Sequence, residues 1–129
     1  MMKKINYIET LEFQKDLKQL LKKYISLRED VELIKEAVIE LYHVQKINNS
    51  SVFLIPGFCD ENIKICKIKK FTCDSFKNRG SRSGIRIIYA FFEKELKVEF
   101  LEIYYKGDEE KEDYTRIKEY LKGQIKFFN

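Results

Sequence analysis

The fold of this chain is decided by residues 64–106, which read KICKIKKFTCDSFKNRGSRSGIRIIYAFFEKELKVEFLEIYYK. At the start of the segment, apolar and basic residues alternate from Cys66 to Lys69. Successive side chains of a strand point to opposite faces of the sheet, so Cys66 and Ile68 would share one face and Lys67 and Lys69 the other. The opening therefore predicts a half-buried strand with one basic face, in which Cys66 is a small core residue.

Two apolar runs follow, at Ile85–Phe92 and Val98–Tyr105. The first is apolar at nearly every position and carries a single cation, Arg86. This pattern predicts a central strand that is buried on both faces. The polar break Glu93-Lys94-Glu95 has the length of a hairpin connection, so we expect the two strands to be antiparallel neighbours.

The residues before this segment form a scaffold. Alternation over Ile5–Leu11 predicts a first strand, and apolar positions from Phe13 to Tyr24 recur at the spacing of an amphipathic helix. Ser26-Leu27-Arg28-Glu29 matches a capping box, which would start a second helix that runs to about Gln45. Two helices with so short a joint predict an antiparallel hairpin lying on the sheet.

The remaining elements are short. Val52–Ile55 predicts a strand and Pro56-Gly57 a turn, while Tyr114 to Leu121 predicts a closing helix that stops at Gly123. His43 falls near the end of the second helix, where an imidazole suits the exposed carbonyl groups, and chemistry is the less expected role for it. Together the elements predict an α+β fold with a mainly antiparallel sheet.

Composition limits the classes of protein that this chain can be. At 129 residues, 44% apolar and 36% charged, it fits one densely charged globular domain over residues 1–129 and excludes a disordered chain. Its three cysteines are not spaced as zinc ligands, and no nucleotide or metal motif is present, so we expect no cofactor and no metal. No apolar run suits a signal peptide or a membrane span, which predicts a cytoplasmic protein that does not bind a membrane.

Positive charge is concentrated in residues 64–86, which hold eight lysines and arginines against one acid, Asp74. Such a local polycation is typical of a surface that meets a phosphate-rich partner or an acidic protein. The alternative is a solvated basic face with no ligand.

The order of elements and four motifs resemble the RelE/ParE superfamily of bacterial toxin–antitoxin toxins. The likeness covers about Tyr7 to Leu121, and its most specific part is the Gly84-x-Arg86-x-x-Tyr89 strand. The motifs are Phe13-Gln14-Lys15-Asp16-Leu17-Lys18-Gln19-Leu20, Ile65-Cys66-Lys67-Ile68-Lys69, Arg82-Ser83-Gly84-Ile85-Arg86-Ile87-Ile88-Tyr89 and Glu102-Ile103-Tyr104-Tyr105-Lys106-Gly107-Asp108.

The resemblance implies a RelE-like fold: an N-terminal strand and helical hairpin on a mainly antiparallel sheet, with a C-terminal helix. It also implies a toxin that a cognate antitoxin inhibits and that, in the RelE branch, cleaves mRNA on the ribosome without a metal. Lysine and arginine suit this task, because they offer donors to the charge that builds up on the phosphate. By position, the catalytic residues implied are Lys67, Lys69, Arg86, Lys106 and Tyr114, with Lys77, Arg79 and Arg82 as RNA contacts.

Other readings stay open. Lys67 and Lys69 would have only a structural role if they form the solvent side of a strand and Arg86 pairs with Glu99 or Glu102. A ParE-like gyrase inhibitor would be expected to lack the basic cluster. A non-catalytic orphan or phage-borne binding module is favoured by the acidic run at 108–113, which would repel RNA if it faced the site. No histidine lies near the site, so a general base would have to be a lysine of lowered pKa or the ribosome.

Overall fold

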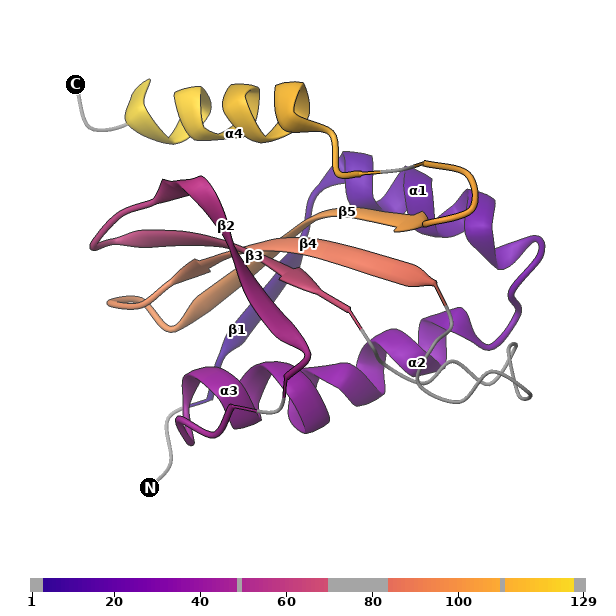
Figure 1. The fold of residues 1–129 in the computed structure, drawn as a ribbon, viewed down its shortest axis with the longest axis horizontal. Helices are drawn as coiled ribbons and strands as arrows, with labels where there is room; N and C mark the ends of the chain where they lie inside the picture. Colours follow the sequence, from indigo (N-terminus) through magenta and orange to yellow (C-terminus); the bar gives the residue numbers. More distant parts are fainter. Residues whose placement is uncertain (1–3, 49, 70–83, 110, 127–129) are drawn as a thin grey trace.

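The computed structural model describes residues 4–48, 50–69, 84–109 and 111–126. It is an α+β fold in which a strand and a helical region precede four strands and a last helix (Figure 1). The elements are β1 (Asn6–Glu9), α1 (Leu11–Leu21), α2 (Leu27–Ile34), a π-helical segment (Lys35–Glu40), α3 (Leu41–His43), β2 (Val52–Cys59), β3 (Ile63–Ile68), β4 (Ile85–Phe92), β5 (Lys97–Tyr105) and α4 (Tyr114–Lys126).

The strands form one five-stranded sheet in the order β1-β5-β4-β3-β2. All neighbours are antiparallel except β1 and β5, which run parallel. The prediction of a buried central strand over Ile85–Phe92 is confirmed, because β4 has these bounds and lies in the middle of the sheet. Its antiparallel pairing with the following strand is also confirmed.

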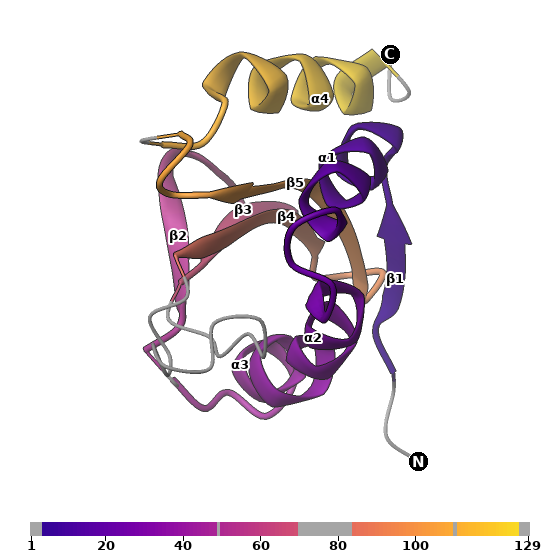
Figure 2. The same ribbon diagram turned by 90° about the vertical axis from the view of Figure 1, so that its right-hand side faces the viewer.

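Both faces of the sheet are covered, which explains why β4 is apolar at every position except Arg86. Figure 2 shows α2 and α3 on one side of the sheet and α4 on the other. Ile87 and Tyr89 belong to the core cluster that packs against α1 and α2, whereas Ile88 and Ala90 belong to the cluster beneath α4. The fold therefore has two hydrophobic cores, one on each face of the sheet.

The helical region differs from its prediction in two details. Helix α1 is capped by Thr10, whose Oγ1 accepts a hydrogen bond from the Phe13 amide. The predicted capping box at the start of α2 is wrong, because the Ser26 hydroxyl instead donates to the Asp30 carboxylate at 2.9 Å. The second predicted helix is interrupted by the π-helical segment, a distortion that the apolar spacing does not reveal.

Strand β2 is longer than expected because Pro56 and Gly57 lie inside it rather than in a turn. The pairing of β2 with β3 shifts register between Leu54 and Cys59, which is the mark of a bulge. Pro56 is tolerated because β2 is an edge strand, and Gly57 supplies the φ of +87° that the bulge uses.

Two further expectations are corrected by packing. His43 is buried instead of facing the helix-end solvent, and its imidazole stacks on the Phe91 ring at 3.9 Å between centroids. Helix α4 continues through Gly123, where an interior glycine costs about 1 kcal/mol relative to alanine and is tolerated.

Cys66 is fully buried in the core, as predicted. Within the described residues, no helix has the length and apolar character that crossing a membrane requires.

Candidate active site

Lys67 lies in β3 on the face of the sheet that α4 covers. Its Nζ contacts both carboxylate oxygens of Glu112, at 2.9 and 3.1 Å. The Glu112 side chain is only 5% exposed and that of Lys67 16%. Glu112 belongs to the acidic connection between β5 and α4, so this connection folds back over the basic strand. The sequence predicted the cation but not its intramolecular partner.

Arg86 lies on the same face, in the neighbouring strand. Lys67 pairs with Ile88 of β4, and Arg86 is two positions from Ile88 on the same side of the strand. The predicted proximity of Lys67 and Arg86 follows from this register. The Arg86 guanidinium donates to the Ile85 carbonyl at 3.2 Å. In the part of the chain that the structure describes, no ion pair joins Arg86 to Glu99 or Glu102, so the expected structural pairing is wrong.

Lys69 and Lys106 extend the positive charge toward one end of the sheet. The Lys69 Nζ lies 4.9 Å from the centroid of the Phe53 ring. Phe53 is the β2 partner of Lys67, so these three side chains share a face. Lys106 is exposed, and its amide donates to the Gly84 carbonyl at 2.8 Å, just beyond the Arg86 end of β4.

Tyr114 is placed apart from these cations by its described contacts. It begins α4 and packs its ring against Phe58 of β2, with 5.7 Å between centroids, and the Lys111 Nζ lies 5.0 Å from the centroid of the same Tyr114 ring. Three other predicted residues, Lys77, Arg79 and Arg82, lie outside the described residues.

A buried carboxyl group, which the sequence suggested only as a possible ion-pair partner of Arg86, lies beside the cations. Glu102 is 3% exposed and sits opposite Ile88, in the same row across the sheet as Lys67. Its Oε1 accepts a hydrogen bond from the Asp113 amide at 3.0 Å. Burial raises the pKa of Glu102 to about 7, and nearby Glu109 adds to the rise. Glu102 can therefore gain or lose a proton near neutral pH.

Tyr104 adds a hydroxyl to this group. It is buried and pairs with Arg86 across β4 and β5. Burial raises the pKa of the Tyr104 phenol well above its usual value, and the charges of Glu112 and Glu102 raise it further, while Arg86 opposes them. The phenol thus keeps its proton at physiological pH and can donate it in a hydrogen bond.

An ion pair between α4 and α1 holds α4 in place over the site. Arg116 of α4 donates to Asp16 of α1 at 2.7 Å and to the Leu101 carbonyl of β5 at 3.0 Å. One guanidinium therefore ties α4 to α1 and to the sheet. This link fixes the start of α4, and with it the connection that carries Glu112.

The arrangement can bind an anion and move a proton. Lys67 and Arg86 supply positive charge, Tyr104 supplies a neutral donor, and Glu102 supplies a titratable carboxyl group. Glu112 occupies the position at Lys67 that an anionic ligand would take. We call these five residues the acid–base cluster.

No family model matches the sequence, and no curated protein matches it. Solved structures are similar to the chain, among them the following two. A chain of the archaeal RelE–RelB complex from Pyrococcus horikoshii OT3 is 12% identical, with a TM-score of 0.49, and the match covers 81% of this chain and 98% of that one. The conserved hypothetical protein HP0892 from Helicobacter pylori is 16% identical, with a TM-score of 0.47 and coverage of 80% and 96%. At these identities the likeness concerns the fold alone.

Proposed function

We propose that this protein is the toxin of a toxin–antitoxin pair and cleaves mRNA at the acid–base cluster. The observation that carries the proposal is the meeting of Lys67 and Arg86 on one face of adjacent strands, beside the buried carboxyl group of Glu102. Two cations near a group that titrates close to pH 7 suit the cleavage of a phosphodiester bond.

The reaction proposed is an internal transesterification of RNA. The ribose 2′-oxygen bonds to the adjacent phosphorus, the bond from phosphorus to the 5′-oxygen breaks, and a cyclic phosphate results. Glu102 in its ionised form accepts the proton of the 2′-hydroxyl. Lys67 and Arg86 stabilise the negative charge on the phosphoryl oxygens, and the Tyr104 hydroxyl donates a hydrogen bond to them. Lys106 would protonate the departing 5′-oxygen or contact the next phosphate.

Glu112 must leave Lys67 before RNA binds there. The carboxylate neutralises the ammonium group at 2.9 Å, so an RNA phosphate and Glu112 compete for one cation. The chain would thus be inactive in solution and active on a partner that moves the connection between β5 and α4. We assign that role to the ribosome, on which mRNA would be presented to Lys69, Lys77, Arg79 and Arg82, with Tyr114 as a further contact.

The cognate antitoxin is proposed to cover the same cations. An amphipathic helix or an added strand with acidic residues would meet Lys67, Lys69 and Arg86. Reversing the charge at Lys69 and Arg86 should then weaken the complex, measured by calorimetry with the purified antitoxin. Unchanged affinity would place the antitoxin on another surface.

A second candidate function is favoured by one observation. Because Glu112 already satisfies Lys67, the cluster also suits a non-catalytic module that binds protein or nucleic acid elsewhere. A ParE-like gyrase inhibitor is less well supported, since the chain retains the basic residues.

The test is inducible expression in bacteria, with growth and mRNA 5′ ends followed together. Growth arrest with new ends inside translated messages is expected for the natural chain, loss of both for Arg86→Ala, and partial loss for Arg86→Lys, which keeps charge but not the guanidinium fork. Lys18→Ala, on the exposed side of α1, removes one positive charge away from the cluster and is the control. Arrest without new ends would contradict cleavage and point to gyrase, and no arrest would favour the binding module.

A further inference from the structure

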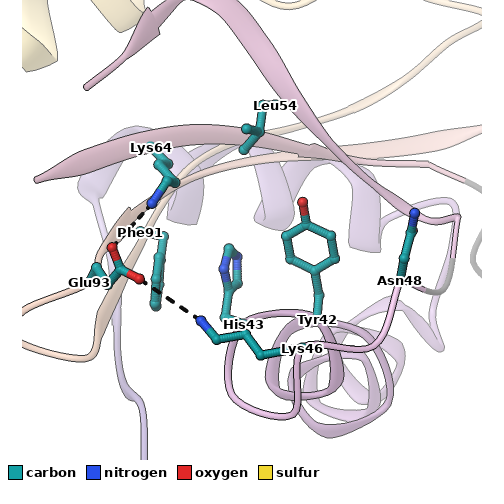
Figure 3. A pocket seen from close by; sticks show the side chains of 8 residues that line it. All are labelled: Tyr42, His43, Lys46, Asn48, Leu54, Lys64, Phe91 and Glu93. Atoms are coloured by element: carbon teal, nitrogen blue, oxygen red, sulfur yellow. Dashed lines mark hydrogen bonds and ion pairs between the residues drawn. The ribbon is translucent and has the colours of Figure 1, made fainter. Parts of the chain in front are cut away.

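A pocket lies on the opposite face of the sheet from the acid–base cluster. Its volume is about 370 Å³, within the range of small-molecule sites. Lys64 of β3 and Phe91 of β4 contribute to it from the sheet, as neighbours in the antiparallel register. Figure 3 shows these side chains facing Tyr42 and His43 of α3. The lining residues are Tyr42, His43, Lys46, Asn48, Leu54, Lys64, Phe91 and Glu93.

The mouth of this pocket has an excess of positive charge. Lys64 contacts Glu93 at 3.2 Å, and Lys46 contacts the same carboxylate at 3.9 Å. Two ammonium groups therefore share one carboxylate, which leaves one positive charge unbalanced. Lys46 is exposed, so its side chain can turn toward a ligand at little cost.

The inner wall is aromatic. His43 stacks on Phe91 and meets Tyr42 edge to face, with 4.9 Å between the ring centroids of the latter pair. The His43 Nε2 and the Tyr89 hydroxyl lie 2.8 Å apart, which fixes the imidazole in the core. Burial, and then the charges of Lys46 and Lys64, lower the pKa of His43 to about 4. The wall is thus uncharged at neutral pH, and the positive charge is confined to the mouth.

The loop that frames the pocket has an unusual backbone. Lys46 and Ser50 both have φ of +60°, in the left-handed region that side chains other than glycine seldom adopt. The Asn48 Oδ1 accepts a hydrogen bond from the Ser50 amide at 3.0 Å, which orients the Asn48 amide group. Strained conformations of this kind persist where surrounding contacts fix them, often at ligand sites.

We propose that this pocket binds a nucleoside monophosphate group. The phosphate would lie between Lys46 and Lys64 at the mouth, where it competes with Glu93. The base would lie against Tyr42 and Leu54, with the Asn48 amide available to its polar edge. A free mononucleotide and the 5′-phosphorylated end of an RNA share this chemistry.

The test uses the fact that the chain has no tryptophan. Leu54 lines the pocket and is 43% exposed, so Leu54→Trp places a single fluorophore there. Its emission is expected to change saturably with adenosine 5′-monophosphate, and much less with adenosine or inorganic phosphate alone. A 5′-phosphorylated trinucleotide that binds more tightly than the mononucleotide would identify an RNA end as the ligand, and equal or weaker binding a free nucleotide.

Charge variants make the test specific. Lys46→Ala and Lys64→Ala should each weaken binding about tenfold, because each removes a charge-assisted contact with phosphate. Lys18→Ala, on the exposed side of α1, makes the same charge change elsewhere and should leave binding unchanged. Calorimetry on the chain with Leu54 intact repeats the titration without the reporter. Absence of a saturable signal in both measurements, or equal loss in Lys18→Ala, would overturn the proposal.

Discussion

Glu112 and Lys67 form an ion pair that lies almost entirely out of solvent, between a connection and a strand that are 45 positions apart in the chain. Replacing Glu112 by glutamine removes the charge but keeps the shape. Lys67 then becomes available to a phosphate, so we expect a short single-stranded RNA to bind roughly fivefold more tightly, or about 1 kcal/mol. Fluorescence anisotropy with a labelled RNA measures this, with the exposed Glu119→Gln as control.

The same substitution should weaken the fold. A partly buried Lys67 left without its partner costs about 1–3 kcal/mol of unfolding free energy. Urea denaturation measures the loss. If Glu112→Gln were less stable but bound RNA no better, the ion pair would be a structural link and not a competitor of RNA.

The free energy of unfolding should depend on pH because Glu102 titrates at different pH values in the folded and unfolded chain. Its pKa is about 7 in the fold against a usual 4.5, so between these values the folded chain binds more protons than the unfolded chain. Stability therefore falls as pH rises from about 4.5 to 7, by on the order of 3 kcal/mol. Glu102→Gln keeps an acceptor for the Asp113 amide and should remove this loss, as urea denaturation at pH 5 and pH 8 would reveal. An unchanged difference between the two pH values would mean that Glu102 is ionised throughout.

His43 should make the unfolding free energy depend on pH in the direction opposite to Glu102. Its pKa falls from 6.5 to about 4 on folding, so in this window the unfolded chain binds more protons. Stability contributed by His43 is lost as pH falls from about 6.5 to 4, again by roughly 3 kcal/mol. Between pH 4.5 and 6.5 the contributions of Glu102 and His43 to the unfolding free energy oppose each other. The effect of Glu102 is therefore measured in His43→Phe, and the effect of His43 in Glu102→Gln. In Glu102→Gln, the unfolding free energy should drop steeply on acidification, and His43→Phe should flatten that drop.

Tyr89 and His43 should be energetically coupled through their 2.8 Å contact. Tyr89→Phe leaves a buried imidazole nitrogen without its partner and should cost about 1–3 kcal/mol. The double variant Tyr89→Phe/His43→Phe should cost less than the sum of the single variants, because it removes both polar groups. Additive costs in a double-mutant cycle would show that the hydrogen bond contributes nothing.

The strand pattern could be predicted because it depends on neighbours in sequence. Alternation at Cys66 and Ile68 defines which face each side chain of β3 takes, and the run of β4, apolar except for Arg86, indicates burial on both faces. The π-helical segment at Lys35–Glu40 and the long β2 could not be predicted, because tertiary packing tolerates distortions that local propensity disfavours.

The candidate site was predictable in its cations but not in its acids. Strict alternation would place Glu102 on the same face as Val98 and Phe100, against α1 and α2. The register shift between Ile88 and Tyr89 makes Leu101 an extra residue and turns Glu102 toward Lys67. Likewise, the sequence around residues 108–113 does not indicate which of their acidic side chains contacts Lys67 of β3. An acidic residue between the apolar residues Leu101 and Ile103 was the signal that could have drawn attention to Glu102, although β5 also contains Glu99.

The parallel pairing of β1 with β5 constrains the order in which the chain can fold. Asn6 meets Lys97, so the first strand to leave the ribosome must wait for the last strand before it finds its place. Until then α1 and α2 have no sheet on which to bury Phe13, Leu17 and Val31. The β4–β5 hairpin needs only residues 93–96 to close and is the natural nucleus, onto which the amino-terminal half docks late. A nascent chain of this protein thus exposes an apolar helical surface during most of its synthesis, a window in which chaperones or a binding partner can capture it.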